Sequence, residues 1–498
     1  MDTTRAYARR KLEESEELST AHRQHARYVC EVLLSPADSV SDMRVPSESD
    51  IDDVRTALRW SFGSGGDVSL GIDIASFAAP LWLSRALLSE CREWLAKAAA
   101  AAGDLAPQQE LRLQISHAAS ELFTRGFTDG TEIAWKLTLE RAKAIGDFPA
   151  QFHSHLVLWG GSIRAAQYQD ALDIAQECAQ LANVTGDPGA MAMGEWMLGH
   201  SLHHVACFDD SRLCLTKYFS LETESAHLAS IRATGYDRHV DASAMLSSTL
   251  WILGYPDQAK IWGERSVADA RASGLSIPVG LAMSWACLNT YLSETDISTI
   301  EQDSVALLEQ GRTHSIDSDS GFGLCIMGLC QGLRGQFDKA TPLISEGLRL
   351  LKKARMEAFS VLVLAHTCEL AIKLGRPDEA LNWMTELQNK DKNHEHWCFS
   401  EVLRIRGLLA ELKGNHGSAN THYVQAIDLA HRQRALAWEL RAALNLSVLL
   451  QKQGQHDEAF GVLNPVYKKF QEGFATRDLI EVKDRIAQIR AQASLPAM

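Results

Sequence analysis

The sequence lacks the short motifs that mark the common enzyme classes. Its 498 residues contain no GxxxxGK[ST] phosphate-binding loop, no HExxH zinc motif and no GxSxG nucleophile turn. The ten cysteines are scattered and form no CxxC pair, which favours reduced thiols and a cytoplasmic location over a disulfide framework. The sequence therefore predicts no catalytic residue, no cofactor and no bound metal.

Positive charge and long apolar runs are also scarce. The 49 Lys and Arg residues are outnumbered by 63 Asp and Glu residues, and the net charge is -14. Wrapping nucleic-acid phosphates needs a basic face, so we expect no direct nucleic-acid partner. The most apolar run, residues 71 to 83, contains Asp73 and Pro80 and is too short to span a bilayer. No apolar segment typical of a signal peptide follows the polar start of the chain, so we expect no membrane partner.

A repeat of about 40 residues runs along most of the chain. In each copy a turn residue, here called the anchor, is followed five positions later by a small residue, and a second small residue lies seven positions before nearly every anchor. The anchors are Ala86, Gly126, Ala166, Ala206, Gly254, Ser293, Gly335, Gly375, Gly414 and Gly454. Two antiparallel helices approach closely only where side chains are small, so this spacing predicts helical hairpins stacked on their copies.

The remaining patterns predict an all-α fold. Apolar residues recur at helical spacing and strand-like alternation is absent. We expect a right-handed superhelical solenoid of about ten hairpins, with each anchor at a helix end where glycine best adopts a left-handed backbone. Residues 36 to 50 are rich in turn formers. The expected division is a helical segment and linker over 1–49, the repeat array over 50–490 and a tail over 491–498.

In several repeats a small residue, a turn residue, an aromatic residue or proline, and an alanine follow in that order. This pattern resembles the tetratricopeptide repeat, in an extended form that covers roughly residues 70 to 470. Two flanking regions narrow the resemblance. Segments 2–8, 11–15, 22–26 and 54–61 look like the passage after the ATPase module of bacterial winged-helix regulators of the signal-transduction ATPase class. Segments 438–443, 463–467 and 472–479 resemble the closing repeat of those regulators and of related multidomain nucleotide cyclases.

This resemblance implies a sensor and partner-binding role for the array. It also implies a DNA-binding winged helix and a P-loop ATPase before the array, but no residue of this chain matches either module. The stretch Gly63-Ser64-Gly65-Gly66 lacks the lysine that a phosphate loop needs. On this basis the chain is expected to be a truncated or separately encoded regulator, with residues 1–49 as the remnant that follows the ATPase.

The repeat register also predicts which side chains face the concave groove of the solenoid. In tetratricopeptide hairpins these lie 13, 10, 6 and 3 residues before the anchor. Aromatic and polar side chains in a concavity are typical of ligand sites. Counting back from three neighbouring anchors gives the candidate groove residues His153, Trp196, His200, His203, Asp241 and Trp251. The alternative is that Trp196 and Trp251 simply pack between adjacent hairpins.

Two further sets of polar residues have competing interpretations. His200, His203 and His204 share one helix face and could grip a metal ion, which leaves a metal-dependent enzyme as a remote alternative. Glu401, Arg404, Arg441 and Gln451 also fall near or at groove positions, where we expect a solvated polar face.

The preferred hypothesis is a non-enzymatic sensor or scaffold module of a transcriptional or signalling regulator. Its expected partner is a protein or peptide, with a small-molecule effector as a further option. A stand-alone peptide-binding adaptor is the alternative.

Overall fold

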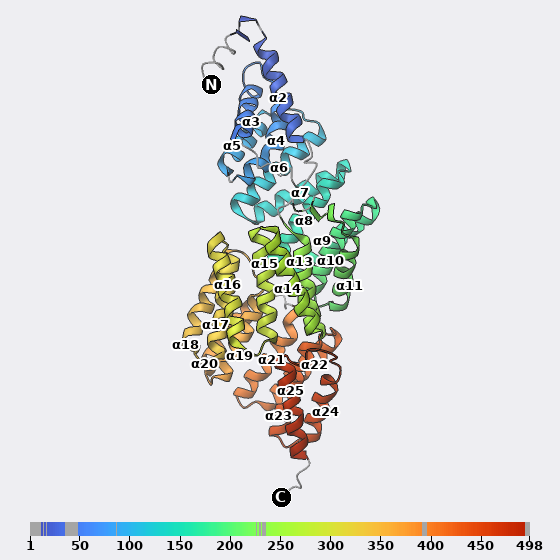
Figure 1. The fold of residues 1–498 in the computed structure, drawn as a ribbon, viewed down its shortest axis with the longest axis vertical. Coiled ribbons are helices and arrows are strands. Elements are labelled where there is room, and N and C mark those ends of the chain that lie inside the picture. Colours follow the sequence, from blue (N-terminus) through green and yellow to red (C-terminus); the bar gives the residue numbers. More distant parts are fainter. Residues whose placement is uncertain are drawn as a thin grey trace. The chain divides into compact units, whose positions relative to one another are not determined.

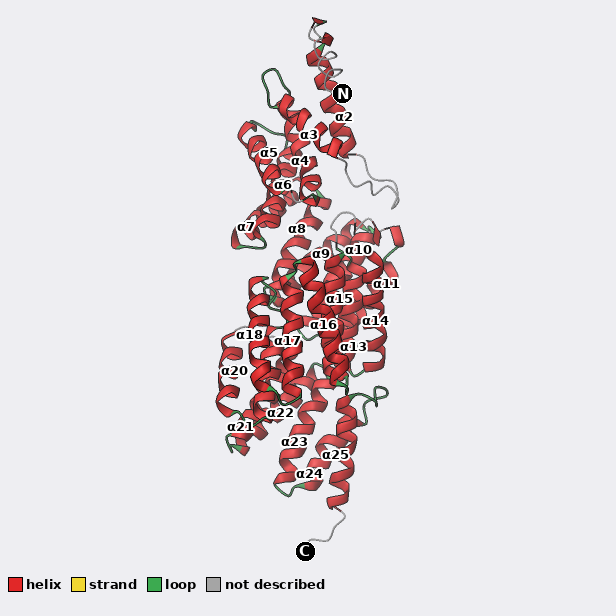
Figure 2. Ribbon diagram, turned by 60° about the vertical axis from the view of Figure 1, so that its left-hand side comes forward, coloured by secondary structure: helices red, strands yellow, loops and turns green. Residues whose placement is uncertain are grey.

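The computed structural model describes residues 11–12, 14–15, 17–34, 48–85, 87–225, 227–228, 231, 236–390 and 396–493. Within these residues every regular element is a helix (Figures 1 and 2). The chain divides into two compact units, Met1–Gly161 and Ser162–Met498. The predicted all-α repeat fold is thus confirmed, and none of the described helices is long and apolar enough to cross a membrane.

The first unit contains seven helices among its described residues, the last of which ends just beyond Gly161. They are α2 (Leu18–Leu34), α3 (Glu48–Ser61), α4 (Val68–Ser84), α5 (Leu88–Ala101), α6 (Pro107–Arg125), α7 (Asp129–Ile145) and α8 (Phe148–Arg164). Helix α2 packs on α3 and α4 and shares their apolar core. The expected linker lies almost wholly outside the described residues, as does the anchor Ala86. The expected boundary at residue 49 therefore stays a prediction.

The second unit is a series of hairpins that begins with α9. Its helices are α9 (Tyr168–Thr185), α10 (Pro188–His204), α11 (Phe208–Leu221), α13 (Arg238–Leu253), α14 (Pro256–Ser273), α15 (Ser276–Ser293), α16 (Ile297–His314), α17 (Asp317–Leu333), α18 (Phe337–Lys353), α19 (Ser360–Lys373), α20 (Pro377–Lys390), the 3₁₀ turn η2 (His396–Cys398), α21 (Phe399–Leu412), α22 (His416–Arg432), α23 (Leu436–Lys452), α24 (His456–Tyr467) and α25 (Arg477–Ala493). Only residues 491–493 of the expected tail are described, and they belong to α25.

The anchors end helices as the sequence predicts. Eight of the ten have a positive φ, including two alanines, Ala166 at 57° and Ala206 at 61°. Ser293 is an exception, because it still belongs to α15 and α16 begins four residues later instead of the usual two. In that hairpin Ile300 is buried, whereas Ser298, the expected packing residue, is exposed. The predicted register is wrong at this one hairpin.

Small residues allow the two helices of a hairpin to cross closely. A Cβ added to Gly407 would lie 2.4 Å from the ring of Tyr423, sixteen residues later, and one added to Gly199 would lie 2.6 Å from Leu215. A hydrogen bond reinforces the crossing of α10 and α11, where Ser211 Oγ donates to the carbonyl of Gly199 over 2.6 Å. At two other crossings the bond runs the opposite way, from the first helix to the second: Ser247 donates to the carbonyl of Ala259 and Cys368 to that of Ala380. The small residues therefore set the hairpin geometry.

The first helices of successive hairpins form the inner layer of the second unit. Each of α10, α13, α15, α17, α19, α21 and α23 contacts the next one in the series. In addition, α13 contacts α23, five hairpins further along the chain, and α10 contacts η2. These long-range contacts bring the inner helices around a common centre. They leave a packed interior where the sequence predicted an open groove.

Candidate functional site

A buried hydrogen-bonded group joins two inner helices at the predicted groove positions. Trp196 and His200 lie on α10, and Asp241 lies at the start of α13. The indole Nε1 of Trp196 donates to Asp241 Oδ2 over 2.7 Å, and His200 Nε2 is 3.7 Å from Asp241 Oδ1. The ring of Tyr236 lies 6.0 Å from that of Trp196. Asp241 of α13 therefore contacts both Trp196 and His200 of α10.

The other two histidines of α10 lie among aromatic rings. His204 stacks on Tyr168 with a centroid distance of 4.5 Å and an interplanar angle of 5°. The rings of Trp285, from α15, and Trp397, from η2, lie 5.7 to 6.3 Å from the two imidazoles. The hydroxyl of Thr249 lies 2.9 Å from His203 Nδ1 and within 2.9 Å of the carbonyl of Met245 on α13, so it hydrogen-bonds the imidazole inside the protein.

Burial sets the charge of this cluster. Trp196, His203 and Asp241 have no exposed surface, and His200 is 5% exposed. Burial, together with a smaller effect of the neighbouring His200, lowers the pKa of His203 to about 3. Burial also lowers the pKa of His200 and raises that of Asp241, which favours the neutral form of both side chains. The imidazoles of His200 and His203 are therefore neutral around neutral pH.

A second buried network fills the opposite part of the interior. The guanidinium of Arg404, on α21, makes paired hydrogen bonds of 2.6 to 3.1 Å with the carboxylates of Glu401 and Glu369 and a 2.8 Å bond with the amide oxygen of Asn445. Burial by itself would raise the pKa of Glu401. The charge of Arg404 and a hydrogen bond from His366 hold that pKa below its usual value. Glu401 is therefore ionised inside the protein.

Trp251 contributes to the same interior from α13. Its ring meets that of Trp438, on α23, edge to face at 4.8 Å. The guanidinium of Arg441 lies over both rings, at 5.2 and 5.3 Å, and donates to Asp478 Oδ2 over 2.6 Å and to the carbonyl of Leu292 over 2.9 Å. This arginine therefore links α13, α15, α23 and α25.

Two expectations about the polar residues need correction. Trp196, His200, His203, Asp241 and Trp251 were expected to be partly exposed to a groove, but all five are buried because the inner helices pack on one another. Glu401, Arg404 and Arg441 were expected on a solvated face, but they form the buried network just described. Gln451 is half-buried and binds Gln492. His153 belongs to the first unit, where it is exposed and lies 4.9 Å from the ring of Trp135.

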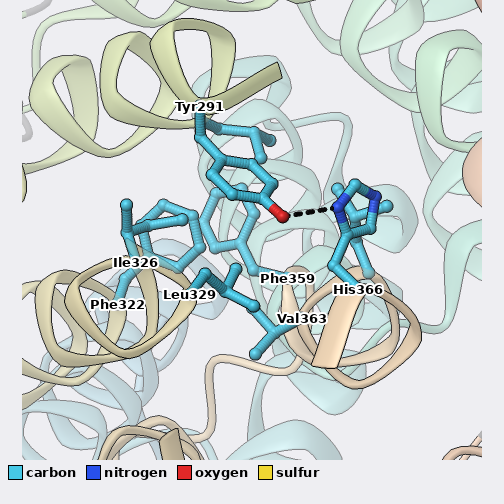
Figure 3. A pocket seen from close by; sticks show the side chains of 9 residues that line it. Tyr291, Phe322, Ile326, Leu329, Phe359, Val363 and His366 are labelled. Carbon is cyan, nitrogen blue, oxygen red and sulfur yellow. Dashed lines mark hydrogen bonds between the residues drawn. The ribbon is translucent and has the colours of Figure 1, made fainter. Parts of the chain in front are cut away.

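A small cavity lies inside the second unit. It is lined by apolar side chains of α15, α17 and α19 and holds about 10 Å³, roughly the room for one water molecule. Tyr291 and His366 border it and are joined by a 2.9 Å hydrogen bond from the tyrosine hydroxyl to His366 Nδ1 (Figure 3). This cavity is therefore too small for a peptide or a small-molecule effector.

The described residues contain no group of three or more His, Cys, Asp or Glu side chains with the geometry of a metal site. His200, His203 and His204 share a helix face, as predicted. However, His203 and His204 have their rings at 88° to each other and are packed against aromatic side chains. The metal-enzyme alternative therefore has no ligand set among the described residues.

Comparison with known proteins gives a limited match to transcriptional regulators. No protein-family model matches the chain. A stretch of 97 residues is 33% identical to putative HTH-type transcriptional regulators of Mycobacterium tuberculosis and Mycobacterium bovis. The match covers 19% of this chain and only 11% of the length of each of these relatives.

Solved structures of low sequence identity have similar arrangements of helices. The APC/C hetero-tetramer Cut9-Hcn1 gives a TM-score of 0.46 at 12% identity, covering 90% of this chain and 87% of that one. A signal-transduction ATPase with a tetratricopeptide repeat sensor from Pyrococcus horikoshii gives 0.41 at 11% identity, with coverage of 89% and 72%. A Rap protein complexed with Competence and Sporulation Factor gives 0.41 at 9% identity, with coverage of 85% and 100%.

Proposed function

We propose that the chain is a non-enzymatic module that binds a protein or peptide partner for a transcriptional or signalling regulator. The observation that carries the binding role is the composition of the inner helices. Beside Trp, their facing positions hold His, Asp, Glu and Arg side chains, which are costly to bury and which apolar side chains could replace in a purely structural core. Such side chains suit a face that also meets water or a partner.

The regulatory context is supported by the 97-residue similarity to putative HTH-type regulators and by the resemblance of both flanks of the array to winged-helix regulators. We assign the partner-binding face to the inner helices in an opened form of the second unit. Its residues are those that the register predicts, Trp196, His200, His203, Asp241 and Trp251. His153 holds the equivalent register position in the first unit.

A peptide library tests this proposal. Phage-displayed random peptides are selected on the full-length chain, and enriched peptides are titrated by calorimetry. We expect binders whose affinity falls at least several-fold in Asp241→Asn, which preserves side-chain volume, but not in Glu481→Gln, an exposed change on α25. Thermal stability is measured in parallel, because a loss of folding would also reduce binding.

Two results would count against the proposal. One is the absence of any enriched peptide, and the other is an equal loss of affinity in both variants. The purified chain is also expected neither to hydrolyse ATP nor to retain duplex DNA at physiological salt. Turnover of ATP above background would contradict the non-enzymatic assignment.

A further inference from the structure

A turn near the end of the second unit caps a helix that lies more than 200 residues earlier. The carboxylate of Glu472 accepts hydrogen bonds of 3.0 Å from the backbone N–H groups of Asp257 and Gln258, at the start of α14. Its other oxygen accepts a 3.0 Å bond from the side chain of Gln258. In return, the N–H of Gly473 donates to Asp257 Oδ2 over 2.9 Å. We call this reciprocal set of bonds the closing contact.

The closing contact is specific in shape. Gly473 has a φ of 77°, and a Cβ at this position would lie 2.0 Å from Cγ of Pro256, the first residue of α14. Only glycine therefore allows the turn to approach the helix. A carboxylate at a helix N-terminus is favourable because it meets unpaired N–H groups and the positive end of the helix dipole.

The closing contact is also easy to break. Glu472 and Asp257 bind each other's segments in an exposed setting, where water competes for the same hydrogen bonds. Each of the two segments joined by the closing contact is next in sequence to a helix whose side chains meet in the interior. Helix α14 follows α13, which carries Trp251, and the Glu472 turn precedes α25, whose Asp478 holds Arg441 between Trp251 and Trp438.

The interior behind the closing contact has the character of a surface that can meet water. Glu369, Glu401, Arg404, Arg441 and Asp478 are charged groups, and burying such groups costs more than packing apolar side chains of the same size. A carboxylate and guanidinium network regains hydration free energy when it opens to water, whereas an apolar core does not. Opening the second unit at this charged interior is therefore less costly than separating the two helices of a hairpin at their alanine-rich crossing.

We propose that the closing contact is an autoinhibitory latch that keeps the inner face of the second unit shut. When Glu472 leaves the start of α14, α13 and α23 separate and expose Trp251, Trp438 and Arg441 to a partner. This inference rests on the proposed function for the identity of the partner face. The opening itself is a property of the chain alone and can be measured without any partner.

Hydrogen exchange of the full-length chain tests the opening. In Glu472→Ala we expect exchange of the amides in α13 and α23 to rise roughly tenfold, the factor that corresponds to the loss of a small set of hydrogen bonds. The matched control is Glu481→Ala, which removes an exposed carboxylate of α25 and should leave these rates unchanged. If exchange rises only around residues 256–258 and 470–476, the latch proposal is wrong.

A second variant opens the latch by a different route. Gly473→Ala places a methyl group against Pro256 and strains a positive φ, so it should raise exchange in the same two helices. Gly461→Ala is its control, because a Cβ there meets no atom within 4 Å. Wild-type exchange in α13 and α23 of a folded Gly473→Ala protein would overturn the proposal. If this variant does not fold, Glu472→Ala decides.

Binding separates the latch from the proposed function. For a peptide that binds only the open form, affinity rises by the same factor as the open population, so Glu472→Ala should tighten binding by the factor measured in hydrogen exchange. Faster exchange with unchanged affinity for a selected peptide would show that the contact does not control access, which overturns its autoinhibitory role. Faster exchange with no peptide binder for either protein would leave the opening standing and overturn the proposed function, together with the autoinhibitory role that rests on it.

Discussion

At the scale of single residues, the turn positions with a left-handed backbone are where the residue type matches the local backbone conformation least well. Glycine occupies most of them, because an L side chain at positive φ is strained. Ala166, Ala206, Ser315, Arg355 and Arg434 adopt the same conformation without being glycine. The surrounding helix ends hold these residues in place, so some stability is lost at each one.

Ser315 offers the cleanest test, because it is exposed and ends α16 with a φ of 57°. Ser315→Gly should raise the free energy of unfolding by about 0.5 to 1 kcal/mol, because strain in the folded state is relieved. Ala268→Gly, at an exposed position inside α14, should lower it by a similar amount of about 0.5 to 1 kcal/mol. Urea denaturation measures both, and a change of the same sign in the two variants would contradict the strain argument.

The buried histidines make stability depend on pH. Burial lowers the pKa of His204 well below its usual value, and the described residues offer neither ring nitrogen a hydrogen bond. Below about pH 6.5 the unfolded state therefore binds a proton at His204 that the folded state does not bind. The free energy of unfolding falls as the pH falls. Below about pH 4.5 the protonation of Glu369 and Glu401, whose pKa values the neighbouring Arg404 holds low, lowers the stability further.

His204→Phe isolates the histidine part of this dependence. Phe preserves the stacking on Tyr168 but does not titrate, so the slope of unfolding free energy between pH 6.5 and 4.5 should decrease by about 1.4 kcal/mol per pH unit. His416→Gln, at an exposed position, should leave the slope as it is in the wild type. An unchanged slope in His204→Phe would mean that this ring titrates normally in the folded state.

At the scale of the helical element, the hairpin crossing is the feature that the sequence predicts best. The small residue seven positions before an anchor and the one five positions after it meet where two helices cross, and both are local enough in sequence to be recognised by spacing. The hairpin after Ser293 shows the limit of this approach. Its turn is longer, and nothing in the spacing distinguishes a serine that is the last residue of a helix from one in the turn that follows.

The hairpin of α21 and α22 provides a matched pair of glycines. Gly407→Ala would place a methyl group 2.4 Å from the Tyr423 ring and should destabilise the protein by about 1 to 3 kcal/mol. Gly417→Ala, in the first turn of α22, meets only the side chain of Asn415 at 3.9 Å and should be neutral or stabilise by up to about 1 kcal/mol. Denaturant midpoints give both values, and a tolerated Gly407→Ala would show that the crossing is looser than described.

At the scale of the whole molecule, the sequence predicts which residues face inward but not what they face. Trp196, Asp241 and Trp251, which the count from the anchors selects, lie on the inner helices and contact side chains of neighbouring inner helices. Whether those helices enclose a groove or close on each other depends on a small rotation per repeat that accumulates over five hairpins. Arg441 shows the consequence, because its partner Leu292 lies 149 residues away and no local pattern connects the two.

The division into two units was not foreseen either, because the repeat spacing continues through it without a change in composition. In repeat arrays each repeat is stabilised by contacts with its neighbours, so these contacts determine how the array unfolds. The division between the two units weakens this coupling at one point. Calorimetry of the full chain should therefore show two unfolding transitions. Leu95→Ala and Leu463→Ala remove fully buried side chains from the first and second unit, at a cost of about 2 to 5 kcal/mol each.

Each variant should lower the midpoint of one transition and leave the other in place. The two substitutions are chemically identical and equally buried, so they serve as controls for each other. A single transition that both variants shift by the same amount would show that the helices on the two sides of Gly161 unfold as one cooperative block. In that case the contacts between neighbouring repeats, and not the division, would determine how the array unfolds.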